Sequence, residues 1–365
     1  MRFLRVLAWA VFLGASWTWC IGMYLPALLV RDYGIWAFVV FAVPNVIGAA
    51  AMAWVLPDAE ASRAFQQKHL LACKWFSFVT ILFHCYFFFF AMSLIEYPIE
   101  ERWPIAIFVF FGLLARLRGG GIIFAIAATA YSGFIAYTLW HVSAIPRLPP
   151  PVPPSMSLIW IGMVCAFGLS LCPYLDLTFH QARQATTPGD GRAAFAIGFG
   201  VFFFAAILFT LAYSYWIVKG TADIVLVPLG SYLLVQTILK ISLHSWAALS
   251  RMKEVGVVAL AFLAILVIGD LCTGRGLTED FEDFYRCFLV FYALVFPAYV
   301  WICIFGKKSP RVWIAAVLIA APMYWMGFIE RQMIWLLPGV AVPVLVGLLP
   351  FRRVRPPTAY CSPSA

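Results

Sequence analysis

Two stretches of this sequence share one pattern, 14-GASWTWCIGMYLP-26 and 168-GLSLCPYLDLTFHQ-181. Each has a glycine-x-serine group near the middle of a long apolar run and a proline further along. Glycine and proline are poor residues for a helix interior, because glycine is flexible and proline has no backbone N–H to donate. We therefore expect an apolar helix with a break near its middle in each half of the chain.

The composition indicates that these helices lie in a membrane. Of the 365 residues, 64% are hydrophobic and 11% are charged, and the mean hydropathy is +0.94. A soluble domain has about 25% charged residues, so the surplus of apolar side chains has to face lipid. The sequence predicts an all-α integral membrane protein whose main partner is the lipid bilayer. The net charge of +9 does not indicate nucleic-acid binding, since the basic residues lie in small groups between the apolar runs.

A helix needs about 20 apolar residues to cross the hydrocarbon core of a bilayer. By this criterion we expect about 12 transmembrane helices in the chain. They are predicted at residues 3–30, 35–56, 70–95, 99–117, 120–143, 156–180, 194–218, 224–250, 255–272, 284–306, 312–329 and 332–349.

The loops between these spans alternate between basic and acidic, which predicts their orientation. Basic groups such as Arg2 with Arg5 and Lys307 with Lys308 fall in one set of loops, whereas the acidic run 279-EDFEDFY-285 falls in the other. Loops rich in lysine and arginine stay on the cytoplasmic side. We therefore expect both termini in the cytoplasm and the protein in a bacterial cytoplasmic membrane.

The proline-rich segment 146-PRLPPPVPP-154 divides the spans into two sets. The two broken spans are the first and the sixth, so they cross the membrane in opposite directions, as an inverted-topology repeat requires. A second interpretation stays open, in which each break is a kink that lets helices pack closely. The expected organisation is a first five-helix repeat (1–143), an extracytoplasmic connector (144–155), a second five-helix inverted repeat (156–306), two additional helices (307–349) and a cytoplasmic tail (350–365).

This order of spans, with breaks in the first and the sixth, resembles the LeuT-type fold of the amino acid–polyamine–organocation superfamily. The run 17-WTWCIGMYLPALLVRDYGIWAFVVFAVPNVIGA-49 resembles the opening of sodium:solute symporter-like proteins, and 242-SLHSWAALSRM-252 resembles the eighth helix of the superfamily. The chain is short for a sodium:solute symporter, so we expect a divergent member. The resemblance implies a secondary transporter that works by alternating access.

The resemblance also implies a place for a coupling ion. Transporters of this fold bind sodium with carbonyls of the first helix and hydroxyls of the eighth. Lys240, near the middle of the eighth span, departs from that pattern, because its ammonium would replace the sodium ion and favour proton coupling, exchange or uniport. Thr237, Lys240 and His244 share one helical face, which we expect to point to the interior. The coupling-ion or proton site is expected at Ala15, Thr18, Lys240, Ser242, His244 and Ser245.

Aromatic and polar residues around the two breaks form the expected solute site. Trp17, Trp19 and Tyr24 are expected to form an aromatic wall for an organic solute. Asp176 is expected to form an ion pair with Lys240, because charged groups at membrane depth are costly and usually functional. Two alternatives stay open, that the pair only locks the bundle or that Asp176 caps a helix. The predicted substrate-binding residues are Ser16, Trp17, Trp19, Tyr24, Ser170, Tyr174 and Asp176.

Other polar residues are assigned supporting roles. Asn45 is expected to satisfy the broken backbone of the first helix, and His84 to be a buried, hydrogen-bonded histidine. No cysteine or histidine spacing indicates a metal site, and we expect no cofactor beyond Na⁺ or H⁺ as the coupling ion. Cys272 and Cys287 flank one loop, and their pairing as a disulfide stays open.

The sequence thus predicts a secondary active transporter of a small organic solute rather than an enzyme. It has no GxxxxGK[ST] motif for nucleotide binding. Two other classes stay open, a membrane-embedded enzyme that acts on a lipid or lipid-linked substrate and a solute sensor that does not transport. The sequence does not specify the solute, the coupling ion or the oligomeric state.

Overall fold

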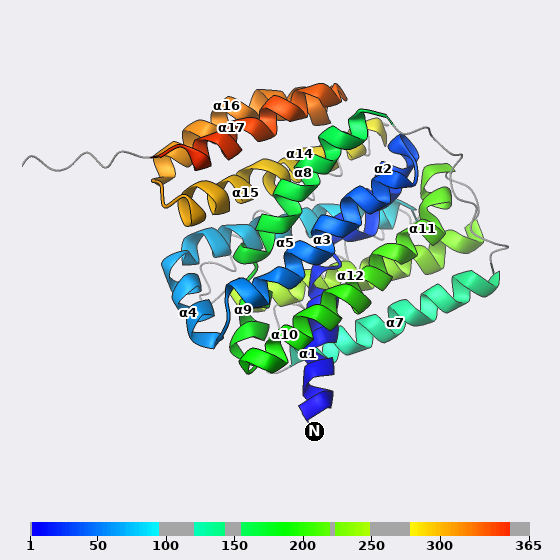
Figure 1. The fold of residues 1–365 in the computed structure, drawn as a ribbon. Coiled ribbons are helices and arrows are strands. Elements are labelled where there is room, and N and C mark those ends of the chain that lie inside the picture. The colour runs from blue at the N-terminus through cyan, green and yellow to red at the C-terminus, as the bar shows by residue number, and fades with distance from the viewer. Residues whose placement is uncertain (1, 95–119, 143–154, 220–222, 249–277, 351–365) are drawn as a thin grey trace, which may run out of the picture.

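The computed structural model describes residues 2–94, 120–142, 155–219, 223–248 and 278–350. Every regular element in these ranges is a helix, and the long helices run side by side in one bundle (Figure 1). Within these ranges, seven helices are long and apolar enough to cross a membrane, or eight if a bent pair at the N-terminus is one span. The chain is an all-α integral membrane protein.

The helices occur in three groups along the chain. The first group is α1 (Arg2–Trp17), α2 (Cys20–Tyr33), α3 (Trp36–Val55), α4 (Ala59–Lys68), α5 (Leu70–Leu94) and α7 (Gly120–Val142). The second is α8 (Ser157–Leu171), the 3₁₀-helix η1 (Cys172–Leu175), α9 (Leu177–Gln184), α10 (Pro188–Ile197), the π-helix η2 (Gly198–Phe203), α11 (Phe204–Lys219) and α12 (Asp223–Ala248). The third is α14 (Thr278–Val290), the π-helix η3 (Phe291–Val295), α15 (Phe296–Tyr299), the π-helix η4 (Val300–Phe305), α16 (Pro310–Phe328), the 3₁₀-helix η5 (Met333–Trp335) and α17 (Leu336–Leu348).

Helices therefore occupy the predicted spans that fall within the described ranges. The spans predicted at 99–117 and 255–272 lie outside those ranges, and so does most of the connector at 144–155. The short helix α4 was not predicted, because its polar sequence gives no signal of a span. Cys287 has a free thiol, and Cys272 lies outside the described residues. The count of 12 spans and the positions of the termini stay predictions.

The first span is interrupted, as the sequence predicts. α1 and α2 are separated by two non-helical residues and meet at a bend of 58°. The Thr18 amide still bonds back to the Gly14 carbonyl at 3.2 Å, but the Trp19 amide donates to the Trp17 carbonyl at 2.8 Å. The helical hydrogen-bond ladder thus stops at Trp19, which is extended (φ −79°, ψ 175°), and a new helix begins at Cys20.

The sixth predicted span is also interrupted. α8 is followed by the single 3₁₀ turn η1, which contains Pro173, and then by α9. Asp176 is extended (φ −77°, ψ 113°) and caps α9 by accepting a hydrogen bond from the Thr178 amide at 2.7 Å. A proline that cannot donate and an aspartate that caps the next helix account for the break. Of the open alternatives for Asp176, the helix cap is thus present.

The two broken spans lie side by side and run in opposite directions. At the start of α1, Arg2 pairs with Asp190 in α10 at 2.6 Å. At the end of α1, the rings of Trp17 and Phe179 in α9 have centroids 4.9 Å apart. Beyond the break, α2 lines a cleft together with α8. As the first span advances from α1 to α2, its partners thus move back along the chain, from α10, which follows the sixth span, to α9 and then to α8 within it.

The contacts of the two halves mirror each other. α10, η2 and α11 pack along the first broken span, and in the same way α3 packs along α8. α7 packs against α1, as η3 and α15 pack against α8, and α5 packs against α12. α16 and α17 lie side by side at one edge of the bundle (Figure 1).

Proline also explains an irregularity in the helical run from α14 to η4. Pro297 has no N–H, so the carbonyl of Ala293, four residues earlier, has no partner within an α-helix. The hydroxyl of Tyr324 in α16 donates to this carbonyl at 2.9 Å. The residues just before Pro297 form the π-helix η3, which contains Tyr292. π-Helical segments of this kind are frequent at functional sites.

The close approach of α3 and α8 depends on Gly48. A Cβ atom added there would lie 2.4 Å from the Cα atom of Ser170 and 3.0 Å from the Leu169 carbonyl oxygen. We expect Gly48→Ala to force the helices apart and to lower the free energy of unfolding by about 1–3 kcal/mol. Thermal unfolding in detergent micelles measures this loss. Gly133→Ala is the matched control, because a Cβ at residue 133 meets nothing within 4 Å. Equal unfolding temperatures for Gly48→Ala and the unmodified chain would contradict the expectation.

Candidate functional site

A small cavity lies where the two breaks meet. We call it the central cavity. Its lining comes from the first broken span, α3, the sixth broken span and η3, which are far apart in the sequence. Most of the lining is aromatic or aliphatic, with one amide and one thiol. The lining residues are Trp17, Trp19, Ile21, Gly22, Asn45, Leu169, Cys172 and Tyr292.

Side chains from other helices satisfy the backbone at the first break. The Nε2 atom of His84 in α5 accepts a hydrogen bond from the Cys20 amide at 3.2 Å. The Nδ1 atom of the same ring lies 2.7 Å from the Thr80 carbonyl. Because an amide can only donate and a carbonyl can only accept, His84 is neutral with its proton on Nδ1. The Tyr285 hydroxyl donates to the Cys20 carbonyl at 3.1 Å. His84 is thus a buried, hydrogen-bonded histidine, as the sequence predicts.

Trp17 and Trp19 form the wall of the cavity on the first span. Their ring centroids are 4.3 Å apart, and both rings are almost fully buried. The Trp19 indole donates to the Ser16 carbonyl and the Trp17 indole donates to the Asn45 side-chain oxygen, each at 2.6 Å. Asn45 was expected to bond the broken backbone, and this expectation is wrong. It bonds the Trp17 side chain instead, because the indole projects from the end of α1 toward α3.

Asp176 and His244 approach each other across the sixth and eighth spans. The Asp176 Oδ2 and His244 Nε2 atoms are 4.0 Å apart, and both side chains are 0% exposed. The expected ion pair between Asp176 and Lys240 is absent from the described residues. The Lys240 ammonium donates to the Gln236 side chain, one turn back along α12, whereas Asp176 lies beside His244, one turn forward. Thr237, Lys240 and His244 are all fully buried, so their predicted interior face is confirmed.

Three of the four residues expected at a sodium site, Ala15, Thr18 and Ser242, have hydrogen-bond partners within their own helices. The Thr18 hydroxyl donates to the Gly14 carbonyl at 2.8 Å, and the Ala15 carbonyl accepts the Thr18 amide at 3.3 Å. The Ser242 hydroxyl donates to the Ile238 carbonyl at 2.8 Å. Ser245 is buried as well, at 8% exposed. Among the described residues, no group of three or more histidine, cysteine or acidic side chains could hold a metal ion.

The other predicted solute residues lie away from the central cavity. The Ser16 hydroxyl donates to the Leu13 carbonyl at 3.0 Å. Tyr24 packs edge-on against Tyr285 in α14, with ring centroids 5.1 Å apart. Ser170 lies at the crossing of α8 with α3, and Tyr174 packs against Phe305 in η4. Of the residues predicted at the two breaks, Trp17 and Trp19 are therefore the ones that line the cavity.

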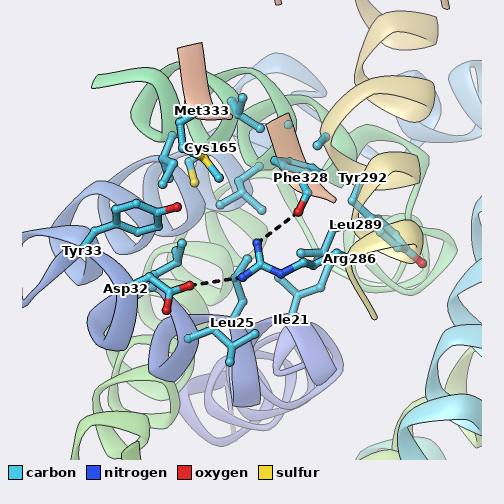
Figure 2. Close-up of a pocket in the computed structure, with 17 residues that line it drawn as sticks. Ile21, Leu25, Asp32, Tyr33, Cys165, Arg286, Leu289, Tyr292, Phe328 and Met333 are labelled. Atoms are coloured by element: carbon cyan, nitrogen blue, oxygen red, sulfur yellow. Dashed lines mark hydrogen bonds and ion pairs between the residues drawn. The ribbon is translucent and has the colours of Figure 1, made fainter. Parts of the chain in front are cut away.

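A larger cleft adjoins the central cavity between α2, α8 and η3. We call it the α2–α8 cleft. It encloses about 730 Å³ of space, including its open part, and its walls are almost entirely apolar. Ile21, Leu169 and Tyr292 line both the cleft and the central cavity, so these three side chains separate the two spaces. At the edge of the cleft, Arg286 lies between Asp32 and the Phe328 carbonyl (Figure 2).

Ion pairs join the two halves of the chain at both ends of the first broken span. At the end of α2, Arg31 makes two hydrogen bonds of 2.8 Å to the Glu282 carboxylate in α14. Arg286 also donates to Glu282, at 2.6 Å, and to Asp32, at 3.2 Å. We call this group, with Arg331 at 3.7 Å from Glu282, the α2–α14 charge cluster.

At the start of α1, Asp190 in α10 accepts hydrogen bonds from Arg2 at 2.6 Å and from Arg5 at 3.1 Å. The first span is therefore held by charged residues of the second half both before and after its break. The side chains of Arg2 and Arg5 are more than half exposed, so this end is the weaker of the two.

Several residues of this region were not predicted from the sequence. Gln236 could have been found, because it lies one turn from Lys240 on the same polar face of α12. Tyr292 and Phe179 gave no signal, since aromatic residues are frequent throughout this chain. Arg183 is 0% exposed and donates to the carbonyls of Leu56 and Pro57, which ties α9 to the segment after α3.

Comparison with solved structures shows a distant likeness. No protein-family model and no curated protein matches this sequence. Among solved structures, the chain is similar to Mhp1, a nucleobase-cation-symport-1 family transporter, in a closed conformation with bromovinylhydantoin bound. The match covers 94% of this chain and 91% of that chain, with 11% sequence identity and a TM-score of 0.43. An identity and a score this low do not place the chain in that family.

Proposed function

We propose that this protein is a secondary active transporter that moves a small organic solute by alternating access. The observation that carries the proposal is the meeting of two interrupted, antiparallel spans at one buried cavity. Lipid cannot satisfy broken backbone, so a break at membrane depth persists only where protein, water or a bound solute supplies partners. Paired broken helices at corresponding places in two halves are the best pointer to a transporter's binding site.

The proposed architecture is a LeuT-like 5+5 inverted repeat with two additional helices. The mirrored contacts support it, because exchanging the two halves exchanges the contact of α3 with α8 for the contact of η2 with α1. It also exchanges the contact of α7 with α1 for the contact of η3 with α8. The contact between α5 and α12 is exchanged with itself. A pseudo-two-fold axis in the membrane plane has this effect.

The proposed solute site is the central cavity. Its aromatic and aliphatic lining favours an uncharged organic solute, since a charged one would lose its hydration without a counter-charge in the lining. Trp17, Trp19 and Tyr292 would enclose the solute, and the Asn45 amide and the Cys172 thiol are its polar neighbours. The ion pairs at both ends of the first span support a closed state of the cycle.

Uptake into proteoliposomes tests this proposal. The purified chain would be given a panel of radiolabelled amino acids, nucleobases, sugars and organic cations, under an imposed sodium gradient, a proton gradient or neither. We expect one class of solute to enter faster than into protein-free liposomes. Turnover of the liposome lipid without entry of any solute would support the alternative of a membrane-embedded enzyme and overturn the proposal.

A further inference from the structure

Two buried polar atoms face each other at the centre of the bundle without a hydrogen-bond partner among the described residues. They are Oδ2 of Asp176 and Nε2 of His244, and 4.0 Å separates them. A buried polar atom without a partner is destabilising, and more so if it is charged. Two such atoms, 4.0 Å apart on neighbouring helices, are placed to share one small ligand.

We propose that Asp176 and His244 form a proton-binding dyad, which couples solute movement to proton movement. The inference deepens the proposed transport function and rests on it. The dyad would take one proton from water on one side of the membrane and release it to water on the other. The proton binds a lone pair of the imidazole or of the carboxylate, and no other bond forms or breaks.

The remaining atoms of both side chains are already occupied. Asp176 Oδ1 accepts from the amide and the hydroxyl of Thr178, both at 2.7 Å. His244 Nδ1 lies 3.3 Å from the Ser77 hydroxyl in α5. Each side chain is thus oriented by one set of contacts, which leaves the two free atoms 4.0 Å apart. The proton would therefore bind between Oδ2 of Asp176 and Nε2 of His244.

The distance gives the dyad a mechanical consequence. An N–H···O hydrogen bond has a length of about 2.7–3.2 Å, so the present gap is about 1 Å too long. With a proton between them, the two atoms can bond and draw α9 and α12 together. When the neutral His244 carries its proton on Nδ1, toward the Ser77 hydroxyl, the unprotonated dyad has two lone pairs facing each other and the helices separate. Proton binding is therefore linked to the relative position of the sixth and eighth spans.

A change in the charge of His244 would also affect the break in the first span. The rings of Trp19 and His244 have centroids 5.5 Å apart in an edge-to-face arrangement. A positively charged imidazolium interacts with an indole more strongly than a neutral imidazole does. The charge of the dyad thus acts on a side chain that lines the central cavity.

His84 and Lys240, the basic groups that neighbour His244, have hydrogen-bond partners of their own. His84 uses both ring nitrogens for the Thr80 carbonyl and the Cys20 amide. The Lys240 ammonium donates to Gln236. Within the described residues, Asp176 is the carboxylate nearest to His244. The neighbouring titratable groups are Lys240 on α12, His84 and Cys73 on α5, Cys20 on α2, Cys172 on η1 and Tyr292 on η3.

The chemistry of the pair favours a proton over a sodium ion. Hard cations select oxygen ligands, whereas an imidazole nitrogen suits protons and transition metals. The dyad offers one oxygen and one nitrogen.

Nitrogen NMR of the histidines tests the dyad without any solute. The chain has 5 histidines, so full-length protein labelled with ¹⁵N-histidine in lipid nanodiscs gives few imidazole signals. We expect the His244 signal, identified by its loss in His244→Gln, to change with pH. In Asp176→Asn, which keeps an oxygen for Thr178 but cannot share a proton, this change is lost. A His244 signal that does not respond to pH, or that responds equally in Asp176→Asn, would overturn the dyad. His180→Gln is the control, since His180 bonds Ser62 and the Tyr174 carbonyl and its removal leaves the His244 signal unchanged.

A second measurement separates this inference from the proposed function. The solute would be one found by the uptake panel. Asp176→Asn should lose accumulation driven by a proton gradient, and it should retain a larger fraction of its solute counterflow than of this accumulation. Accumulation that follows a sodium gradient and is unaffected in Asp176→Asn overturns the dyad and leaves transport standing. If the unmodified protein moves no solute, the proposed function fails, and the NMR titration still decides whether the pair shares a proton.

Discussion

Replacing Trp19 with alanine is expected to abolish solute uptake and to lower the free energy of unfolding by about 3–5 kcal/mol. Trp19 is 2% exposed and lies at the break of the first span. Its indole N–H donates a hydrogen bond to the Ser16 carbonyl at 2.6 Å. Its ring packs against Phe76, His244 and Tyr292, with centroids 5.3–5.5 Å away. Alanine would leave a cavity between four spans and would release the backbone at the break.

Thermal unfolding in detergent micelles and proteoliposome uptake measure the two effects. Trp19→Phe separates their causes, because it keeps an aromatic ring but removes the N–H that Ser16 accepts. We expect this variant to lose about 1–3 kcal/mol and part of its uptake. Trp54→Ala is the matched control, since Trp54 is 51% exposed on the outer face of α3. If Trp19→Ala and Trp54→Ala behave alike, the assignment of Trp19 to the solute site is wrong.

Replacing Glu282 with glutamine is expected to open the α2–α14 charge cluster. Glu282 accepts from Arg31 and Arg286, and its side chain is 16% exposed. Glutamine has the same size but no charge, so three arginines would remain with Asp32 as their carboxylate. Hydrogen bonds to charged groups contribute about 1.5–3 kcal/mol each, and partial exposure favours the lower end. Since about 1.4 kcal/mol is a factor of ten, we expect the open population to rise about tenfold.

Labelling of Cys165 with a maleimide reports this opening. Cys165 lines the α2–α8 cleft and is 7% exposed in the closed structure. Its rate of modification, resolved from the other cysteines by peptide mass spectrometry, should rise with the open population. Asp283→Asn is the control, because the neighbouring Asp283 is not a member of the cluster. An unchanged Cys165 rate in Glu282→Gln would mean that the cluster does not hold the cleft closed.

Within the described ranges, the sequence alone determined where the long apolar helices lie and where two of the spans break. Long apolar runs form helices in lipid because no other structure satisfies the backbone there. The positions of the breaks also depend on nearby residues. Pro173 has no backbone N–H to donate, and the helical hydrogen bonds of the first span stop at Trp19. The buried face of Thr237, Lys240 and His244 was predictable too, because polar side chains at membrane depth avoid lipid.

Only the tertiary structure decided which side chains meet. Asp176 faces His244 rather than Lys240, Asn45 bonds an indole rather than backbone, and Tyr292 joins the cavity from a span far along the chain. A helix that is apolar all round carries no stripe to fix its rotation, and a shift of one turn moves a residue by about 5.4 Å along the axis. Rotation and axial position are set by contacts such as Gly48 against Ser170, which exist only once the helices have packed.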